Sequence, residues 1–303
     1  MRSGLGYGAH LLLIDFDGRG WRPDSVTSYA RAARRLGYGS LAVNDHIVFQ
    51  RPWLDGIVAL ASVVEHSGDM QLVTTVALPV VRGPAVVAKT AAALDVLSGG
   101  RLVLGVGPGS SPRDYALAGL RFDERWARFD EAVPVLRAYL NGAAAPSAEV
   151  LRPLPGRVPG PQIWIASWGS DAGLARVARL GDGWLASGYN ATPARVADAR
   201  AKLAAALARD GRRLDDFPCA VATLWTYVTE DRHAAATHLA GLAELLARPV
   251  DQLANRVLIG GAEQCAALLR AYADAGIDRV FIWPVADAED QLARFMRDVV
   301  PLV

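Results

Sequence analysis

The feature that most constrains the fold is a regular alternation of short apolar segments with longer amphipathic ones along most of the chain. The short segments favour buried strands, whereas the longer ones repeat apolar residues at helical spacing. Strands that alternate with helices form parallel sheets with right-handed crossovers. Eight such units fit a closed (β/α)8 barrel better than the alternative, an open doubly wound sheet with a helical appendage. The expected strands are residues 8–14, 40–43, 71–78, 101–105, 163–166, 183–186, 220–228 and 279–283.

The length of the chain is compatible with one domain. Barrels of this class commonly fold as a single unit at this size, so we expect residues 1–303 to form one barrel domain. Residues 141–160 are rich in Ala, Pro and Gly, and this composition predicts a surface excursion from the barrel.

Charge and cysteine content argue against several classes of function. The 32 basic and 31 acidic side chains give a net charge of +1 and form no basic stripe, so we expect a small-molecule substrate and no nucleic acid. Cys219 and Cys265 form no close-spaced pair, which argues against a disulfide framework and a cysteine zinc site, and no metal is expected. Because no apolar run reaches 18 residues and no signal sequence is evident, we expect a cytoplasmic protein that does not span a membrane.

Asp45 and His46 follow directly after the expected strand 40–43. In a barrel of parallel strands, catalytic groups lie at the carboxyl ends of the strands. A histidine changes its charge state near neutral pH, and a neighbouring carboxylate favours its protonated form, so this pair suits general acid–base catalysis. The alternative, about equally consistent with the pattern, is a loop acid that caps the next turn beside an exposed histidine.

Two glycine- and serine-containing loops are candidates for binding phosphate. One is Gly105–Ser111, which follows a strand, and the other is Ser167–Ser170, which precedes a helix. Free backbone amides in such loops and at helix N-termini bind anions. A dinucleotide fingerprint requires glycine where the first loop has Ser110, so a nicotinamide-binding fold is disfavoured. The simpler alternatives are a tight turn for the first loop and helix capping for the second.

Several motifs in this order resemble the bacterial luciferase-like monooxygenase superfamily, the flavin- or deazaflavin-dependent (β/α)8 barrel oxidoreductases. The matching segments are Leu36–Leu41, Asn44–His46, Val73–Ala77, Ala93–Arg101, Gly105–Gly109, Pro161–Ile165 and Leu180–Trp184. They cover nearly the whole chain. The Leu-Ser-Gly-Gly-Arg segment that ends at Arg101 and the Gly-Asp-Gly-Trp segment that ends at Trp184 are specific in combination.

The resemblance implies a tricyclic ring across the carboxyl mouth of the barrel. It places a non-proline cis peptide at Thr75–Val76 behind the ring, although a plain buried strand would also explain these residues. The family's catalytic histidine corresponds to His46, with Asp45 beside it. The phosphate tail would lie against the backbone of Gly107, Gly109, Ser110, Ser111, Ser167, Gly169 and Ser170.

Within this superfamily, the run from Gly107 to Asp114 looks most like the branch that uses coenzyme F-420, a 5-deazaflavin. The resemblance therefore implies hydride transfer between the deazaflavin and a small organic substrate, with His46 moving the proton. Sugar-phosphate dehydrogenases of this branch carry an acid at Ser110, which argues against a sugar-phosphate substrate. The resemblance also suggests a homodimer.

Three alternatives remain open at this point. The first is an FMN-dependent monooxygenase that uses O2 and is supplied by a separate flavin or deazaflavin reductase. The second is a phosphate-binding isomerase or aldolase without a redox cofactor. The third is a barrel that binds flavin or deazaflavin without catalysis, which the presence of both Asp45 and His46 disfavours.

Overall fold

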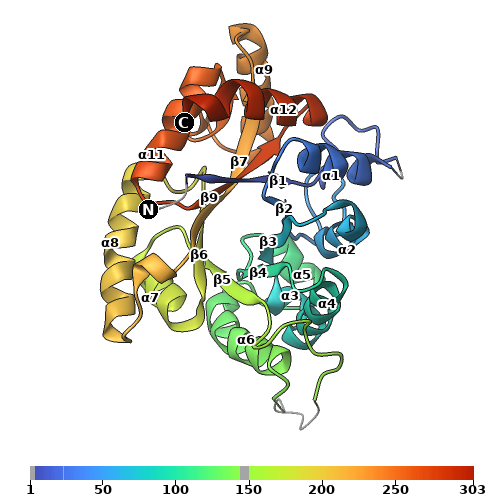
Figure 1. The fold of residues 1–303 in the computed structure, drawn as a ribbon, viewed down its shortest axis with the longest axis vertical. Coiled ribbons are helices and arrows are strands. Elements are labelled where there is room, and N and C mark those ends of the chain that lie inside the picture. Colours follow the sequence, from blue (N-terminus) through green and yellow to red (C-terminus); the bar gives the residue numbers. More distant parts are fainter. Residues whose placement is uncertain (1–3, 23, 144–149) are drawn as a thin grey trace.

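The computed structural model describes residues 4–22, 24–143 and 150–303. In these residues nine strands form one parallel sheet, and eight of them close into a ring because β9 pairs with both β7 and β1. The strands are β1 Gly6–His10, β2 Ser40–Val43, β3 Gln71–Ala77, β4 Leu102–Val106, β5 Gln162–Ala166, β6 Gly183–Ser187, β7 Cys219–Val228, β8 Leu258–Gly260 and β9 Arg279–Pro284. The predicted (β/α)8 barrel is therefore confirmed (Figure 1).

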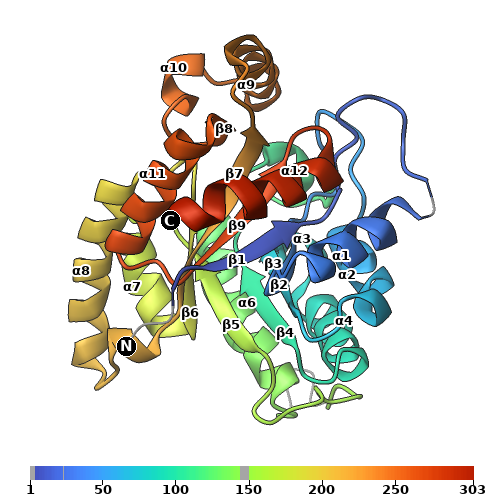
Figure 2. The same cartoon turned by 45° about the horizontal axis from the view of Figure 1, so that its top comes forward.

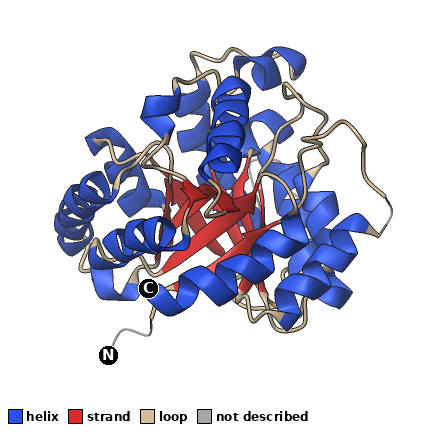
Figure 3. Cartoon of the chain, turned by 90° about the horizontal axis from the view of Figure 1, so that it is seen from above, coloured by secondary structure: helices blue, strands red, loops and turns tan. Residues whose placement is uncertain are grey.

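The helices surround this ring on the outside, as Figure 3 shows from above. The longer ones are α1 Ser25–Arg35, α2 Gly56–Ser62, α4 Pro84–Leu97, α6 Arg125–Leu140, α7 Asp171–Leu180, α8 Pro193–Arg209, α9 Arg232–Leu246, α11 Ala262–Asp274 and α12 Ala288–Arg294. Shorter elements are α3 Pro79–Arg82, α5 Pro112–Leu117, α10 Val250–Leu253, and the single turns η1 Val64–His66, η2 Leu214–Asp216, η3 Phe295–Val299 and η4 Val300–Leu302.

The strands are buried on both faces, which explains their continuous apolar character. One layer of side chains fills the interior of the barrel, and a larger apolar layer lies between the strands and the helices. The interior layer consists of Ala42, Val73, Val103, Trp164, Leu185, Ala220, Ala222 and Phe281. The barrel is therefore a packed core rather than a pore, and only its ends are free to bind ligands.

Three details differ from the sequence prediction. The first strand ends at His10 rather than Ile14, and Ile14 instead forms an isolated bridge with Trp53. The extra strand β8 pairs only with β7, and it lies beside α9 (Figure 2). The short helices α3, α5 and α10 were not expected, because four to six residues are too few to show a helical repeat.

The remaining part of the fold agrees with the prediction as far as it is described. Residues 144–149 of the expected surface excursion lie outside the described residues. No helix in the described part of the chain is long and apolar enough to cross a membrane.

Candidate functional site

The carboxyl ends of the barrel strands bring together residues that are far apart in the sequence. His10 ends β1, Asn44 to His46 follow β2, and Thr75 and Val76 lie near the end of β3. The strands are paired in this order, so the three segments are neighbours at one mouth of the barrel. The predicted position of Asp45 and His46 at a strand end is correct.

His46 is held by a carboxylate that lies 68 residues away in the sequence. Its Nδ1 is 2.7 Å from Oδ2 of Asp114, which is on α5 and is fully buried. Oδ1 of Asp114 accepts the backbone N–H groups of Ile47 and Val48, both at 2.9 Å. Burial alone would raise the pKa of Asp114, but the hydrogen bonds from His46, Val48 and Ile47 lower it below its usual value. The side chain of His46 is 16% exposed, so the imidazole remains accessible from outside.

Asp45 does not lie against His46. Its carboxylate forms a bidentate ion pair with Arg82, at 2.7 Å to Nε and 2.6 Å to Nη2, and accepts the backbone N–H of Leu78. Arg82 also donates to Asp55, which caps α2. Burial opposes the charge of Arg82, but the two carboxylates raise its pKa. In this structure Asp45 joins the loop after β2 to α3, and the acid that contacts the imidazole is Asp114.

The Thr75–Val76 peptide bond is cis, as the resemblance implied. The hydroxyl of Thr75 donates to Oδ1 of Asn44 at 2.8 Å and lies 2.9 Å from Nε2 of His10. Burial lowers the pKa of His10 to about 3, against an opposing hydrogen bond with Asn44, so this imidazole is neutral. A neutral His10 that donates from Nε2 satisfies the threonine oxygen and ties β1 to β3 beneath the mouth.

Aromatic rings form a continuous cluster next to His46. His10 stacks on Trp283 with ring centroids 3.7 Å apart, and Trp283 stacks on Trp225 at 4.3 Å. Trp53 contacts both Trp283 and His46, which links the stack to the partly exposed imidazole. Among the described side chains, the indole N–H groups of Trp53 and Trp225 are buried without a hydrogen-bond partner. A buried donor without a partner is unfavourable, and a bound ligand or water with an acceptor would relieve it.

The two predicted phosphate loops start side by side, because β4 and β5 are paired up to Val106 and Ile165. Ser110 and Ser170 are exposed, whereas Ser167 is buried. The hydroxyl of Ser111 caps α5, and that of Ser170 caps α7 by accepting the N–H of Gly173 at 3.2 Å. The capping alternative is therefore correct for Ser170, which still leaves the exposed part of the loop free to bind an anion.

Three positions in these loops favour glycine. A Cβ on Gly107 would lie 2.9 Å from Cγ2 of Val76, the residue after the cis peptide. Gly169 has a φ of +85°, in the region that favours glycine. Gly109 likewise has a positive φ. The first loop therefore lies directly against the bulge of β3.

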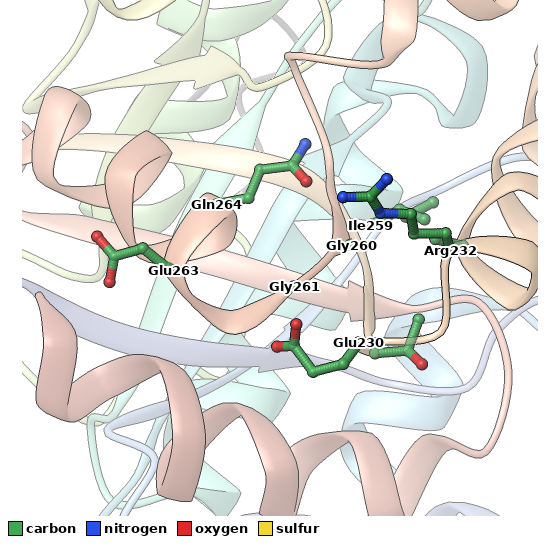
Figure 4. Close-up of a pocket in the computed structure, with 9 residues that line it drawn as sticks. Glu230, Arg232, Ile259, Gly260, Gly261, Glu263 and Gln264 are labelled. Atoms are coloured by element: carbon green, nitrogen blue, oxygen red, sulfur yellow. The ribbon is translucent and has the colours of Figure 1, made fainter.

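A separate cavity of about 390 Å3 lies outside these segments, at the ends of β7 and β8 (Figure 4). Its lining residues are Thr229, Glu230, Arg232, Ala235, Ile259, Gly260, Gly261, Glu263 and Gln264. None of the predicted site residues belongs to this lining. Within the described residues, no group of three or more His, Cys, Asp or Glu side chains is placed to hold a metal ion.

Sequence reasoning missed several residues of the mouth. Asp114 was noted only as the last residue of the run that resembles the F-420 branch, and Asn44, Trp53, Trp225 and Trp283 were not assigned to the site. The positions of Asn44 and Trp283 at strand ends were the available signal. No spacing in the sequence connects Asp114 with His46, because they belong to loops after different strands.

A closed (β/α)8 barrel with a buried carboxylate and a half-buried imidazole at its carboxyl mouth has the arrangement of a barrel enzyme. Residues 15–248 match the family model described as luciferase-like monooxygenase. The chain belongs to the luciferase-like monooxygenase family, and the resemblance drawn from its motifs is confirmed.

Three known proteins are similar to this chain. The F-420-dependent glucose-6-phosphate dehydrogenase of Amycolatopsis mediterranei is 26% identical over an alignment 319 residues long. The alignment covers 92% of this chain and 94% of the relative. An F-420-dependent secondary alcohol dehydrogenase, solved with an F-420–acetone adduct, has a TM-score of 0.85 at 18% identity and covers 99% of both chains. The oxygenating constituent of 3,6-diketocamphane monooxygenase from Pseudomonas putida, solved with FMN, has a TM-score of 0.73 at 14% identity over 98% of both chains. The two solved structures share the fold.

Proposed function

We propose that this protein is a coenzyme F-420-dependent oxidoreductase that transfers a hydride between the deazaflavin and a small organic substrate. His46 would donate or accept the accompanying proton. The observation that carries the proposal is the half-buried imidazole of His46, held at 2.7 Å by Asp114 at the carboxyl mouth of the barrel. The named activities of the relatives support the choice of F-420, because the glucose-6-phosphate dehydrogenase and the secondary alcohol dehydrogenase both use this coenzyme.

The residues at the mouth fit such a cofactor. Gly107 approaches Val76 so closely that a side chain would collide, and the exposed Ser110 and Ser170 lie on adjacent loops. The loop amides and hydroxyls would hold the phosphate, whereas the ring would lie near the cis peptide at Thr75–Val76. When bound, the deazaflavin supplies a carbon centre that accepts or gives a hydride, and the protein supplies orientation and electrostatics.

The side chains around His46 perform the remaining tasks. Nδ1 of His46 is occupied by Asp114, so Nε2 is the nitrogen left to exchange a proton with the substrate oxygen. Trp53 and Phe49 pack against the imidazole, with ring centroids at 4.8 and 5.0 Å, and they limit the access of water. The Trp53 ring packs against this imidazole in a T-shaped contact, and its buried N–H has no hydrogen-bond partner among the described residues.

The substrate is proposed only as a class. Ser110 stands where the resemblance implies an acid in sugar-phosphate dehydrogenases, and aromatic side chains line the imidazole. Both features favour a small organic molecule other than a sugar phosphate, such as an alcohol or a ketone. Isopropanol and glucose 6-phosphate are therefore the two substrates to compare.

The first experiment is a spectral titration of the purified protein with coenzyme F-420 and, separately, with FMN. Saturable binding of F-420, followed by reduction of bound F-420 by a substrate, is the expected result. His46→Ala should lower turnover by about 10²–10⁴-fold while leaving the F-420 affinity nearly unchanged. His233→Ala, which alters an exposed histidine on α9, is the matched control and should retain full turnover. Equal turnover in His46→Ala would remove the proposed role of His46.

The same experiment separates the alternatives. Binding of FMN and substrate-dependent consumption of O2, with a separate reductase supplying reduced flavin, would favour the monooxygenase. The similar structure solved with FMN is the reason to test this alternative. Activity without either ring would indicate an isomerase or aldolase, and binding without turnover would indicate a non-catalytic barrel. The expected homodimer stays a prediction, which light scattering of the purified chain tests.

A further inference from the structure

Among the described residues, the carboxylate of Asp114 contacts hydrogen-bond donors but forms no ion pair with a Lys or Arg side chain. Two backbone N–H groups bind Oδ1 at 2.9 Å, and the imidazole of His46 binds Oδ2 at 2.7 Å. The residue is fully buried, and these hydrogen bonds keep its pKa below the usual value. Asp114 is therefore ionised at neutral pH, and an ionised carboxylate only accepts hydrogen bonds.

This arrangement determines which nitrogen of His46 carries the proton. Because Asp114 cannot donate, Nδ1 of His46 must be the donor in the 2.7 Å contact. In the neutral imidazole, Nε2 then has a free lone pair. We propose that Asp114 is a positioning residue that fixes His46 as the Nδ1–H tautomer and directs Nε2 to the reacting oxygen. The catalytic consequence of this inference rests on the proposed function, whereas the assignment of the tautomer does not depend on it.

The position of Asp114 in the fold adds a second argument. Asp114 lies on α5, whose N-cap Ser111 belongs to the proposed phosphate loop and accepts the N–H of Asp114. The next residue, Tyr115, is buried and donates from its hydroxyl to the carbonyl of Pro108 in the same loop. These two hydrogen bonds join the loop to the helix, so the segment that would hold the cofactor phosphate also carries the residue that orients the imidazole.

Asp45 cannot perform this function, although it is adjacent to His46 in the sequence. Both of its oxygens bind Arg82, and its third hydrogen bond is to the backbone of Leu78. The two aspartates are both buried and both receive several hydrogen bonds. Asp45→Asn is therefore a matched control for Asp114→Asn, because it makes the same chemical change in a carboxylate that does not touch the imidazole.

Asp114→Asn tests this assignment because the amide can keep the hydrogen bonds from the two backbone N–H groups while it reverses the direction of the hydrogen bond with His46. Its Oδ1 can still accept from Ile47 and Val48, whereas its Nδ2 presents donors to Nδ1 of His46. That geometry requires the opposite tautomer, with the proton on Nε2. The same exchange of an aspartate that orients a catalytic histidine costs about 10⁴-fold in kcat in a serine protease.

The measurement is a two-bond ¹⁵N–¹H correlation spectrum of the imidazoles in the full chain without cofactor. His46→Gln identifies the His46 signals among the five histidines. We expect the Nδ1–H tautomer in the wild type and in Asp45→Asn, and the Nε2–H tautomer in Asp114→Asn. A wild-type spectrum with the proton on Nε2, or the same tautomer in both proteins, would overturn the proposal, and the wild-type spectrum suffices if the variant does not fold.

Turnover then tests the catalytic consequence separately. In the F-420 assay, Asp114→Asn should lower kcat by about 10²–10⁴-fold with the F-420 affinity changed less than about threefold, whereas the control His233→Ala should retain full activity. Exchange of the tautomer without loss of turnover would overturn the positioning role while leaving the tautomer assignment intact. Failure of the proposed function would appear differently, as an unchanged turnover in His46→Ala.

Discussion

The ion pair between Asp45 and Arg82 allows a quantitative prediction about stability. The side chain of Asp45 is 2% exposed and that of Arg82 is 17% exposed, so water screens the pair poorly. Two unit charges about 4 Å apart attract each other by about 4 kcal/mol at an effective dielectric constant of about 20. Arg82→Met removes this attraction and leaves a buried carboxylate with only the N–H of Leu78 as its described partner. We expect the free energy of unfolding to fall by about 3–5 kcal/mol.

Urea unfolding followed by circular dichroism measures this loss. Arg22→Met is the matched control, because Arg22 pairs with Asp24 at 2.8 Å on the surface, where the side chains are 79% and 55% exposed, and we expect no measurable change. Adding Asp45→Asn to Arg82→Met should recover part of the loss, since the neutral amide still accepts from Leu78. If Arg82→Met were as stable as Arg22→Met, the assignment of the pair as a buried electrostatic link would be wrong.

Two further predictions concern the barrel wall and the base of the site. Gly105→Ala should lower the thermal unfolding midpoint markedly, because the added Cβ would lie 2.0 Å from the carbonyl oxygen of Thr74. The control is Gly241→Ala in α9, whose Cβ would meet nothing within 4 Å and which should leave the unfolding midpoint equal or higher. Differential scanning calorimetry measures both midpoints. Burial lowers the pKa of His10 to about 3 in the folded protein, against 6.5 for the free side chain. Below about pH 6.5 the unfolded chain binds a proton at this histidine that the folded chain does not, so the free energy of unfolding falls by up to about 1.4 kcal/mol per pH unit as the pH decreases toward 3. His10→Phe should remove that slope from urea unfolding measured between about pH 6 and pH 4, and an equal slope in both proteins would contradict the assignment.

The strand and helix order could be predicted because burial of a parallel strand on both faces leaves a strong apolar signal. The strand expected at 40–43 coincides with β2, and the strand expected at 163–166 lies within β5. Short elements have too few residues to show a period, which explains why α5 and β8 were missed. The end of β1 was misplaced because residues 11–14 are apolar and yet leave the barrel after His10.

The sequence predicted where the site lies but not which side chains contact His46 and Asp45. A strand end locates His46, but the residue that holds its imidazole depends on how the loop after β4 folds back over the loop after β2. Adjacency in the sequence suggested Asp45, whose side chain instead points to Arg82. The cis peptide at Thr75–Val76 came from the family resemblance alone, since no residue preference marks a non-proline cis bond.

The closure of the ring by β9 has a consequence for synthesis of the protein. Arg279–Pro284 pairs with β7 on one side and with β1 on the other, so neither neighbouring strand can complete its hydrogen bonds before Pro284 has left the ribosome. Until then β1 and β7 present unpaired backbone groups, which are templates for association with other chains. Nascent polypeptides that stall upstream of Arg279 should therefore depend on chaperones, whereas those released beyond Pro284 can pair β9 with β1 and β7 and so close the barrel.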